Sequence, residues 1–137
     1  MKYFIDTNVF LRVLIKEDPE SFNSGLKLLE KVKKGNIKAV TSSLVLAEIS
    51  WTLGSFYKFK KNDIVRSIKS IISLHGLTIV DEIDWLYALD LYSAKKTKLI
   101  DCLIASKKEI REKKWPVVTY DQDFKKLSVH SITPAEI

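Results

Sequence analysis

Short apolar runs rich in β-branched residues alternate with helical patterns along the whole chain, and this alternation restricts the fold more than any other feature. The runs predict strands at 3–5, 38–40, 77–80, 117–119 and 128–132. Strands separated by helices form units whose right-handed crossovers place parallel strands in one sheet. The sequence therefore predicts an α/β fold, a three-layer α/β/α sandwich around a mostly parallel, five-stranded sheet.

The segments between the strands carry apolar residues at helical spacing and have start and stop signals. Asp18 and Pro19 predict the start of a helix that continues to Gly35. Asp81 is expected to cap a helix that contains Trp85, and this indole is expected to pack in the core. Further helices are expected after Asp6, after a cap at 41–43 with apolar residues from Leu44 to Leu53, from Asn62 or Asp63 to a stop at His75 and Gly76, and from Leu99 to Lys113.

The size and composition of the chain limit its class. Its 137 residues fit one domain, spanning 1–137, and hydrophobic residues make up 46%, enough for a core without disulfides. Cys102 is the single cysteine, so no disulfide forms within the chain and a reducing compartment is expected. The opening MKYFIDTNVF resembles a first strand rather than a signal peptide, and no apolar run has membrane-spanning length. The expected location is cytoplasmic, with no membrane association.

Two acidic residues come directly after expected strands. Asp6 follows the first strand, and Asp121 follows the fourth strand after one tyrosine. The carboxyl ends of parallel strands meet at one edge of an open sheet, where ligands bind. Glu48 lies in the helix after the second strand, and Asp101 opens the helix before the fourth strand, among apolar neighbours. We therefore expect these four carboxylates to meet at that edge.

Each acid also has a purely structural interpretation. Asp6 can cap the first helix, Asp101 can cap its own helix and interact with the helix dipole, and Glu48 can be an exposed residue. Asp123 is expected to cap the short DFKKL turn. Only the combination of acids points to a site.

Four carboxylates in one cleft repel one another, by about 4 kcal/mol for a pair about 4 Å apart at an effective dielectric constant of about 20. Their convergence is unfavourable unless a cation lies among them. Oxygen ligands without Cys or His select Mg²⁺ or Mn²⁺ rather than Zn²⁺. Such an ion activates water and stabilises charge on a phosphoryl oxygen. No histidine base is required, so His75 and His130 are expected to be structural.

Four segments carry a family resemblance, in order along the chain: FIDTNVFL at 4–11, the segment from Ser42 to Glu48, LIDCLIA at 99–105 and VVTYDQDF at 117–124. Together they resemble the PIN domain, and most closely the VapC-like toxin nucleases, across essentially the whole chain. The resemblance implies an Mg²⁺-dependent endoribonuclease, with Mn²⁺ as a substitute. Its products would carry a 5′-phosphate and a 3′-hydroxyl.

The same resemblance assigns residues to the site. It implies that four acids are catalytic and bind the metal: Asp6, Glu48, Asp101 and Asp121. It also implies three auxiliary residues: Asp123, Thr7 and Thr119. All four main acids are present, so nothing in the sequence indicates an inactive enzyme.

The charge of the chain fits a polyanionic partner. There are 23 Lys and Arg and 17 Asp and Glu, a net charge of +6. With the four proposed ligands set aside, 23 basic residues face 13 acidic ones, which leaves +10 on the rest of the molecule. Phosphate contacts from such a surface would give affinity for RNA and little sequence information. Three lysines lead into the expected site and are therefore candidates for RNA contact: Lys95, Lys96 and Lys98.

Protein partners are expected as well. The segment 51–59 contains Trp51, Phe56, Tyr57 and Phe59, an aromatic density that predicts a protein interface. The resemblance to VapC-like proteins implies a homodimer and an antitoxin protein that binds in an apolar groove. We expect the first two helices and the segment 51–59 to provide the apolar contacts.

The sequence leaves other functions open. A haloacid-dehalogenase-like phosphatase needs a second Asp two residues after the first, where this chain has Asn8. A receiver domain needs a Lys after a late strand, and here Asp121 follows the fourth strand. A PIN nuclease of RNA processing that is not a toxin also fits the motifs. The presence of all four carboxylates argues against a non-catalytic PIN module that only binds RNA or protein.

Overall fold

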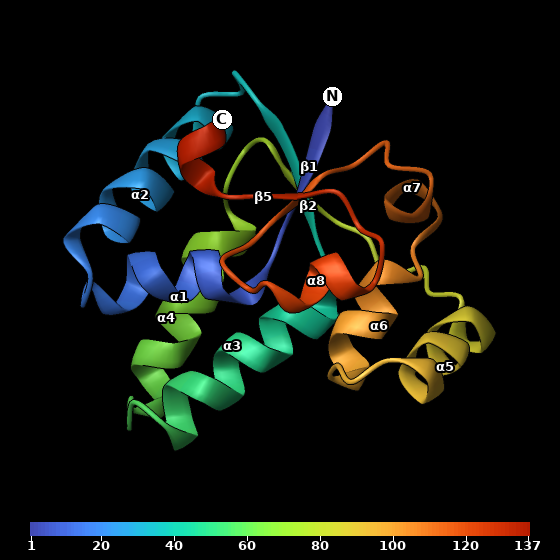
Figure 1. The fold of residues 1–137 in the computed structure, drawn as a ribbon. Helices are drawn as coiled ribbons and strands as arrows, with labels where there is room; N and C mark the ends of the chain where they lie inside the picture. Colours follow the sequence, from blue (N-terminus) through green and yellow to red (C-terminus); the bar gives the residue numbers. More distant parts are fainter.

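A five-stranded sheet forms the centre of the protein in a computed structural model that describes residues 1–137 (Figure 1). Its strands are β1 (Lys2–Ile5), β2 (Lys38–Thr41), β3 (Leu77–Ile79), β4 (Val117–Val118) and β5 (Ser131–Ile132). The strand order is β3-β2-β1-β4-β5, and every neighbouring pair is parallel. The predicted fold class and number of strands are confirmed, and the sheet is parallel throughout.

Helices cover both faces of this sheet. They are α1 (Thr7–Ile15), α2 (Pro19–Lys33), α3 (Ser43–Ser55), α4 (Lys61–Ile72), α5 (Trp85–Ala94), α6 (Leu99–Ala105), α7 (Lys108–Arg111), α8 (Asp123–Lys126) and the 3₁₀ helix η1 (Pro134–Glu136). In Figure 1, α1, α2 and α4 lie on one side of the sheet and α5, α6 and α7 on the other, which gives the predicted three layers. No helix has both the length and the apolar character needed to cross a membrane.

The central strands are apolar on both faces because helices pack against both. Phe4, Ile5, Val40, Val117 and Val118 are fully buried, as expected of strands in a covered parallel sheet. β1 is the middle strand, since Phe4 pairs with Val40 on one side and with Val117 on the other. The carboxyl ends of β1, β2 and β4 therefore lie together at one edge of the sheet.

Local signals set both ends of α2, as predicted. The side chain of Asp18 accepts a hydrogen bond from the N–H of Ser21 at 3.2 Å, and Pro19 occupies the first helical position. Gly35 has a φ of +78°, the left-handed conformation expected of the glycine after a helix.

The predicted cap at Asp81 is wrong. Asp84 caps α5 instead, and its carboxylate accepts a hydrogen bond from an N–H of the first turn at 3.0 Å. The carboxylate of Asp81 accepts hydrogen bonds from the N–H of Ser43 at 2.7 Å and from the hydroxyl of Ser42 at 3.1 Å. Asp81 therefore stabilises the start of α3, a contact between residues far apart in sequence that a local pattern cannot reveal.

The predicted continuous helix from Leu99 to Lys113 is also wrong, because it divides into α6 and α7 at Ser106 and Lys107. Lys107 is only 2% exposed. Its ammonium donates hydrogen bonds to the main-chain carbonyls of Val80 at 2.8 Å and Glu82 at 3.0 Å. These bonds hold the junction of the two helices against the connection between β3 and α5. The chain therefore bends at this junction and does not continue as one straight helix.

The helix α5 lies on the outside of the molecule and packs mainly against α6. Ala88 is its only buried residue. Trp85, which was expected in the core, is 54% exposed. The prediction was wrong because the apolar residues of α5 point outward as well as inward. The large hydrophobic side chains that this helix exposes are Trp85, Leu86, Leu89 and Tyr92.

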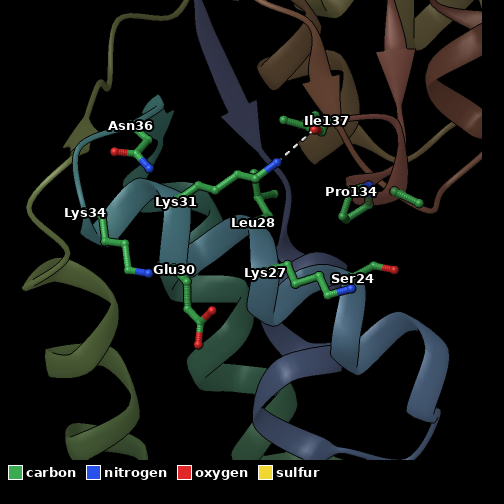
Figure 2. A pocket seen from close by; sticks show the side chains of 10 residues that line it. Ser24, Lys27, Leu28, Glu30, Lys31, Lys34, Asn36, Pro134 and Ile137 are labelled. Atoms are coloured by element: carbon green, nitrogen blue, oxygen red, sulfur yellow. Dashed lines mark hydrogen bonds between the residues drawn. The ribbon is translucent and has the colours of Figure 1, made fainter.

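The last residues of the chain pack against α2 and border a basic pocket (Figure 2). The ammonium of Lys31 donates a hydrogen bond to the main-chain oxygen of Ile137 at 3.0 Å. Lys27 and Lys34 also line this pocket, whose volume is about 390 Å³. Asn36 lines it just before β2, so the pocket lies toward the amino ends of the strands.

Gly76 is where the turn before β3 passes close to the end of α2. A Cβ atom at this position would collide with the carbonyl oxygen of Val32 and would lie 2.9 Å from that of Ile37. Both neighbours are main-chain atoms of ordered segments, so they cannot move aside as a flexible side chain would.

We expect Gly76→Ala to lower the free energy of unfolding by about 1–3 kcal/mol, the usual cost of forcing extra atoms into a packed region. Gly54→Ala is the matched control. Its Cβ would meet only the side chain of Ile64, at 3.4 Å, and alanine favours the helix by about 0.5–1 kcal/mol. Urea unfolding of both variants measures the difference. Equal stabilities would show that the turn at Gly76 adjusts freely.

Candidate active site

Asp6 lies directly after β1, at the carboxyl edge of the sheet. It occupies the residue before α1, but its side chain makes no capping hydrogen bond, so its interpretation as a simple helix cap is wrong. Instead its carboxylate accepts a hydrogen bond from the hydroxyl of Thr119 at 2.8 Å. Thr119 follows β4, so this bond joins the ends of two neighbouring strands. Both residues are buried.

Asn8 completes this contact, a role that was not predicted from the sequence. Its side-chain amide donates hydrogen bonds to the Thr119 hydroxyl at 3.2 Å and to Asp6 at 3.4 Å. Its carbonyl oxygen accepts a hydrogen bond from the N–H of Tyr120 at 3.0 Å. The signal in the sequence was an amide two residues after the first acid, because a side-chain amide has two N–H donors and a carbonyl acceptor.

Thr119 also holds the turn that follows β4. Its hydroxyl accepts a hydrogen bond from the N–H of Asp121 at 3.0 Å. The side chain of Asp121 in turn accepts one from the N–H of Asp123 at 2.9 Å. The predicted cap by Asp123 is therefore wrong: no side chain caps α8, and Asp123 donates its own N–H to Asp121. The carboxylate of Asp123 instead pairs with Lys126 at 3.0 Å.

The four expected acids line one cavity of about 170 Å³. Asp6 and Asp121 reach it from the ends of β1 and β4, Glu48 from α3 and Asp101 from the first turn of α6. In Figure 1 these elements meet in the lower half of the molecule. The other lining residues are Thr7, Asn8, Leu11, Thr52 and Lys98. The cavity is therefore small, its lining residues are polar or charged except for Leu11, and four of the nine are acidic.

A second grouping of acids overlaps with this cavity. Carboxylate oxygens of Asp101, Asp121 and Asp123 lie within 4.8 Å of one another, a spacing that can hold a metal ion. Asp123 does not line the cavity of the four acids. Asp101 and Asp121 are common to both groupings, which makes them the centre of the acidic site.

Burial and mutual repulsion favour the protonated forms of two acids. Burial raises the pKa of Asp6 to about 6, although the Thr119 hydrogen bond opposes this and nearby Glu48 and Asp121 add to it. Burial also raises the pKa of Asp101 to about 7, with Lys98 opposing and the other three acids adding. Perturbed carboxyls in one cleft are typical of functional sites.

Lys98 is the only basic residue that lines the cavity, whereas Lys95 and Lys96 do not reach it. Partial burial lowers the pKa of Lys98, but the four acids, led by Asp101, outweigh this effect and the pKa is raised. Lys98 forms no ion pair within 4.0 Å with any of these acids.

The residues of the cavity fit a divalent cation. One carboxylate oxygen of Asp101 and the hydroxyl of Thr7 are buried without any hydrogen-bond partner. Buried polar atoms are nearly always paired, so two unpaired oxygens on residues of one cavity fit a site that binds a cation. The donors are oxygens without histidine or cysteine, which is the set that Mg²⁺ and Mn²⁺ prefer.

Comparison with known proteins identifies the family of this chain. The sequence pattern of the PIN domain matches residues 3–129. The chain belongs to the PIN domain family. This PIN domain is 26% identical to the VapC ribonuclease of Aquifex aeolicus (strain VF5) over 135 residues, 96% of each chain. The resemblance to VapC-like proteins that the sequence motifs indicated is thereby confirmed.

Solved structures of other proteins have a similar fold. VapBC2 from Rickettsia felis, in a crystal structure bound to a DNA fragment from their promoter, is 26% identical with a TM-score of 0.66, over 97% of both chains. PAE2754 from Pyrobaculum aerophilum (TM-score 0.68, 13% identity, 99% of this PIN domain and 90% of that chain) shares the fold. FitAcB from Neisseria gonorrhoeae also shares it (TM-score 0.65, 15% identity, all of both chains).

The raised pKa values of Asp6 and Asp101 make the metal-free protein less stable as pH rises. Their folded pKa values exceed the ordinary 3.8, so their protons bind more tightly in the folded state. This contribution to stability is complete below 3.8 and is lost as the pH rises through about 6 for Asp6 and about 7 for Asp101. In EDTA, we expect the melting temperature to fall between about pH 5 and about pH 8.

Asp101→Asn provides the control, because it removes the larger of the two pKa shifts and should flatten this decline. Mn²⁺ should restore stability at the higher pH, by about 2.7 kcal/mol at a hundredfold excess over its Kd. A pH profile unchanged by Asp101→Asn, or melts unaffected by millimolar metal, would contradict the site.

Proposed function

We propose that this PIN domain, spanning 1–137, is an Mg²⁺-dependent endoribonuclease that Mn²⁺ also activates, and that it is the toxin of a toxin–antitoxin pair. The observation that carries the proposal is the convergence of Asp6, Glu48, Asp101 and Asp121 on one cavity that contains an unpaired buried carboxylate oxygen. The similarity to a VapC ribonuclease over nearly the whole chain supports RNA as the substrate.

In this proposal the four acids hold the ion. When bound, Mg²⁺ activates water and stabilises the charge on the phosphoryl oxygens. Asp101 and Thr7, whose side chains each have an unpaired buried oxygen, both line this cavity. Thr119 orients Asp6 through its hydroxyl and thus acts on the site indirectly. Asp123 is an auxiliary acid, since it joins Asp101 and Asp121 in the second grouping.

The reaction is the hydrolysis of an RNA phosphodiester. The oxygen of water forms a bond to phosphorus, and the bond from phosphorus to the 3′ oxygen breaks. The 3′ oxygen leaves with a proton, so the products are a 5′-phosphate and a 3′-hydroxyl. Lys95 and Lys96, exposed on the connection between α5 and α6, contribute phosphate contacts along the approach to the cavity.

We expect Asp6→Asn and Asp101→Asn each to reduce metal-dependent cleavage of single-stranded RNA by more than about a hundredfold, because each removes a charged ligand of the ion. Asp123→Asn should reduce it less, because Asp123 does not line the cavity. Cleavage with Mg²⁺ or Mn²⁺, compared with EDTA, measures the effect.

Asp90→Asn is the matched control, since it removes one exposed acid from α5, away from the cavity. Circular dichroism of each variant verifies that the fold is intact. Turnover near that of the unmodified protein in Asp6→Asn or Asp101→Asn would remove that residue from the site. RNA binding without any cleavage would favour a non-catalytic module.

A protein partner is part of the proposal. The similar structure from Rickettsia felis is VapBC2 bound to a DNA fragment from their promoter. In the present protein, an apolar groove of about 450 Å³ runs between α1, α2 and α4. Its apolar lining is Phe10, Val13, Leu14, Leu26, Leu29, Ile71 and Leu74. We propose that an antitoxin segment binds there. The first two helices line the groove as expected, but the segment 51–59 does not.

The exposed aromatic residues suit a second interface. Trp51 and Phe56 at the end of α3 are 71% and 72% exposed. The outer face of α5 adds Trp85 and Leu86. We propose that these surfaces mediate a homodimer, since exposed apolar patches of this kind mark protein interfaces.

We expect co-expression with the product of the neighbouring upstream gene to give a purified complex and to relieve a growth defect caused by the protein alone. An arginine from the partner would pair with the carboxylates bidentately and compete with Mg²⁺. Inhibition should therefore weaken as the metal concentration rises. A protein that is harmless alone and purifies without a partner would refute the toxin assignment and leave the nuclease chemistry intact.

A further inference from the structure

Lys98 differs from every other basic residue of the protein by its position. It is the only cation among the nine residues that line the acidic cavity. It is exposed at the residue before α6, so solvent reaches it. Lys95 and Lys96 belong to the same connection, but neither lines the cavity. The three lysines therefore cannot have the same role.

The ammonium of Lys98 is free to bind a ligand. It forms no ion pair within 4.0 Å with any acid, and it donates no hydrogen bond to any other side chain or carbonyl. An ammonium has three donors and strongly favours anionic oxygens. A structural lysine in this fold looks different: Lys107 is buried and donates to two carbonyls.

The cavity carries more negative charge than one divalent ion neutralises. Its four carboxylates carry a formal charge of −4 when ionised. One divalent ion leaves −2, and a phosphodiester brings a further negative charge. An anionic substrate thus meets net repulsion at the point where its phosphate must approach, unless a second cation lies there. Lys98 is the only side chain at the cavity that supplies one.

We infer that Lys98 is a catalytic residue whose ammonium contacts a non-bridging oxygen of the phosphodiester being cut. This inference rests on the proposed ribonuclease function and adds to the four acids a cation that belongs to the chain itself. The contact strengthens as negative charge accumulates on the phosphoryl oxygens, so it affects the rate of cleavage more than the binding of RNA.

The test compares Lys98→Gln and Lys98→Arg with Lys27→Gln, a control that removes one exposed lysine from α2, which does not line the acidic cavity. Single-turnover cleavage of single-stranded RNA in saturating Mn²⁺ should fall about a hundredfold in Lys98→Gln, and Lys98→Arg should restore most of the rate. Without RNA, Mn²⁺ should bind Lys98→Gln roughly fivefold more tightly, because a nearby positive charge is gone. Lys27→Gln should change neither quantity.

Two results would overturn the inference about Lys98 and leave the proposed ribonuclease function intact. One is an unchanged maximal rate in Lys98→Gln with only weaker RNA binding, which would make Lys98 an ordinary phosphate contact. The other is a lower melting temperature with weaker Mn²⁺ binding, which would make its role structural. An unmodified protein that binds Mn²⁺ but does not cut RNA would overturn the proposed function and the inference together.

Discussion

The parallel pairing of β1 with β4 determines where the first and last acids of the site lie. Main-chain pairing continues beyond β1, because the N–H of Asp6 donates a hydrogen bond to the carbonyl of Val118 at 3.0 Å. The hydroxyl of Thr119 then joins Asp6 to the turn that carries Asp121. Buried strands thus hold two acids near each other before any ion binds. Glu48 and Asp101 approach from helices that pack against the same sheet edge.

The residues after the strands were predictable because a short continuous apolar run and the acid that ends it lie next to each other in sequence. Asp6 and Asp121 follow from this local pattern together with one topological rule about strand ends. The order and parallel arrangement of the strands follow from the helices between them. Glu48 and Asp101 lie on helices, where the sequence does not define which face meets the sheet edge, so their assignment rested on their place near strand ends and on the family resemblance.

What the sequence could not reveal depends on contacts between distant segments. Asp81 was expected to cap the next helix, but it binds Ser43 at the start of α3. Lys107 interrupts an apparently continuous helix, because its ammonium reaches carbonyls after β3. Asn8 resembled an ordinary residue after a strand, yet it joins β1 to the turn after β4. Each case requires a partner that no local pattern identifies.

The way α5 is attached has a consequence for amide hydrogen exchange. Only Ala88 of this helix is buried, and polar contacts hold its start: Ser106 accepts a hydrogen bond from the N–H of Asp84, and Arg111 pairs with the Asp84 carboxylate. Opening α5 alone exposes little additional apolar surface, so it costs less free energy than unfolding the sheet. Its amides therefore exchange through local opening, whereas the amides of β1 and β4 exchange only when the whole domain unfolds. Any surface that covers α5 would slow exchange there first.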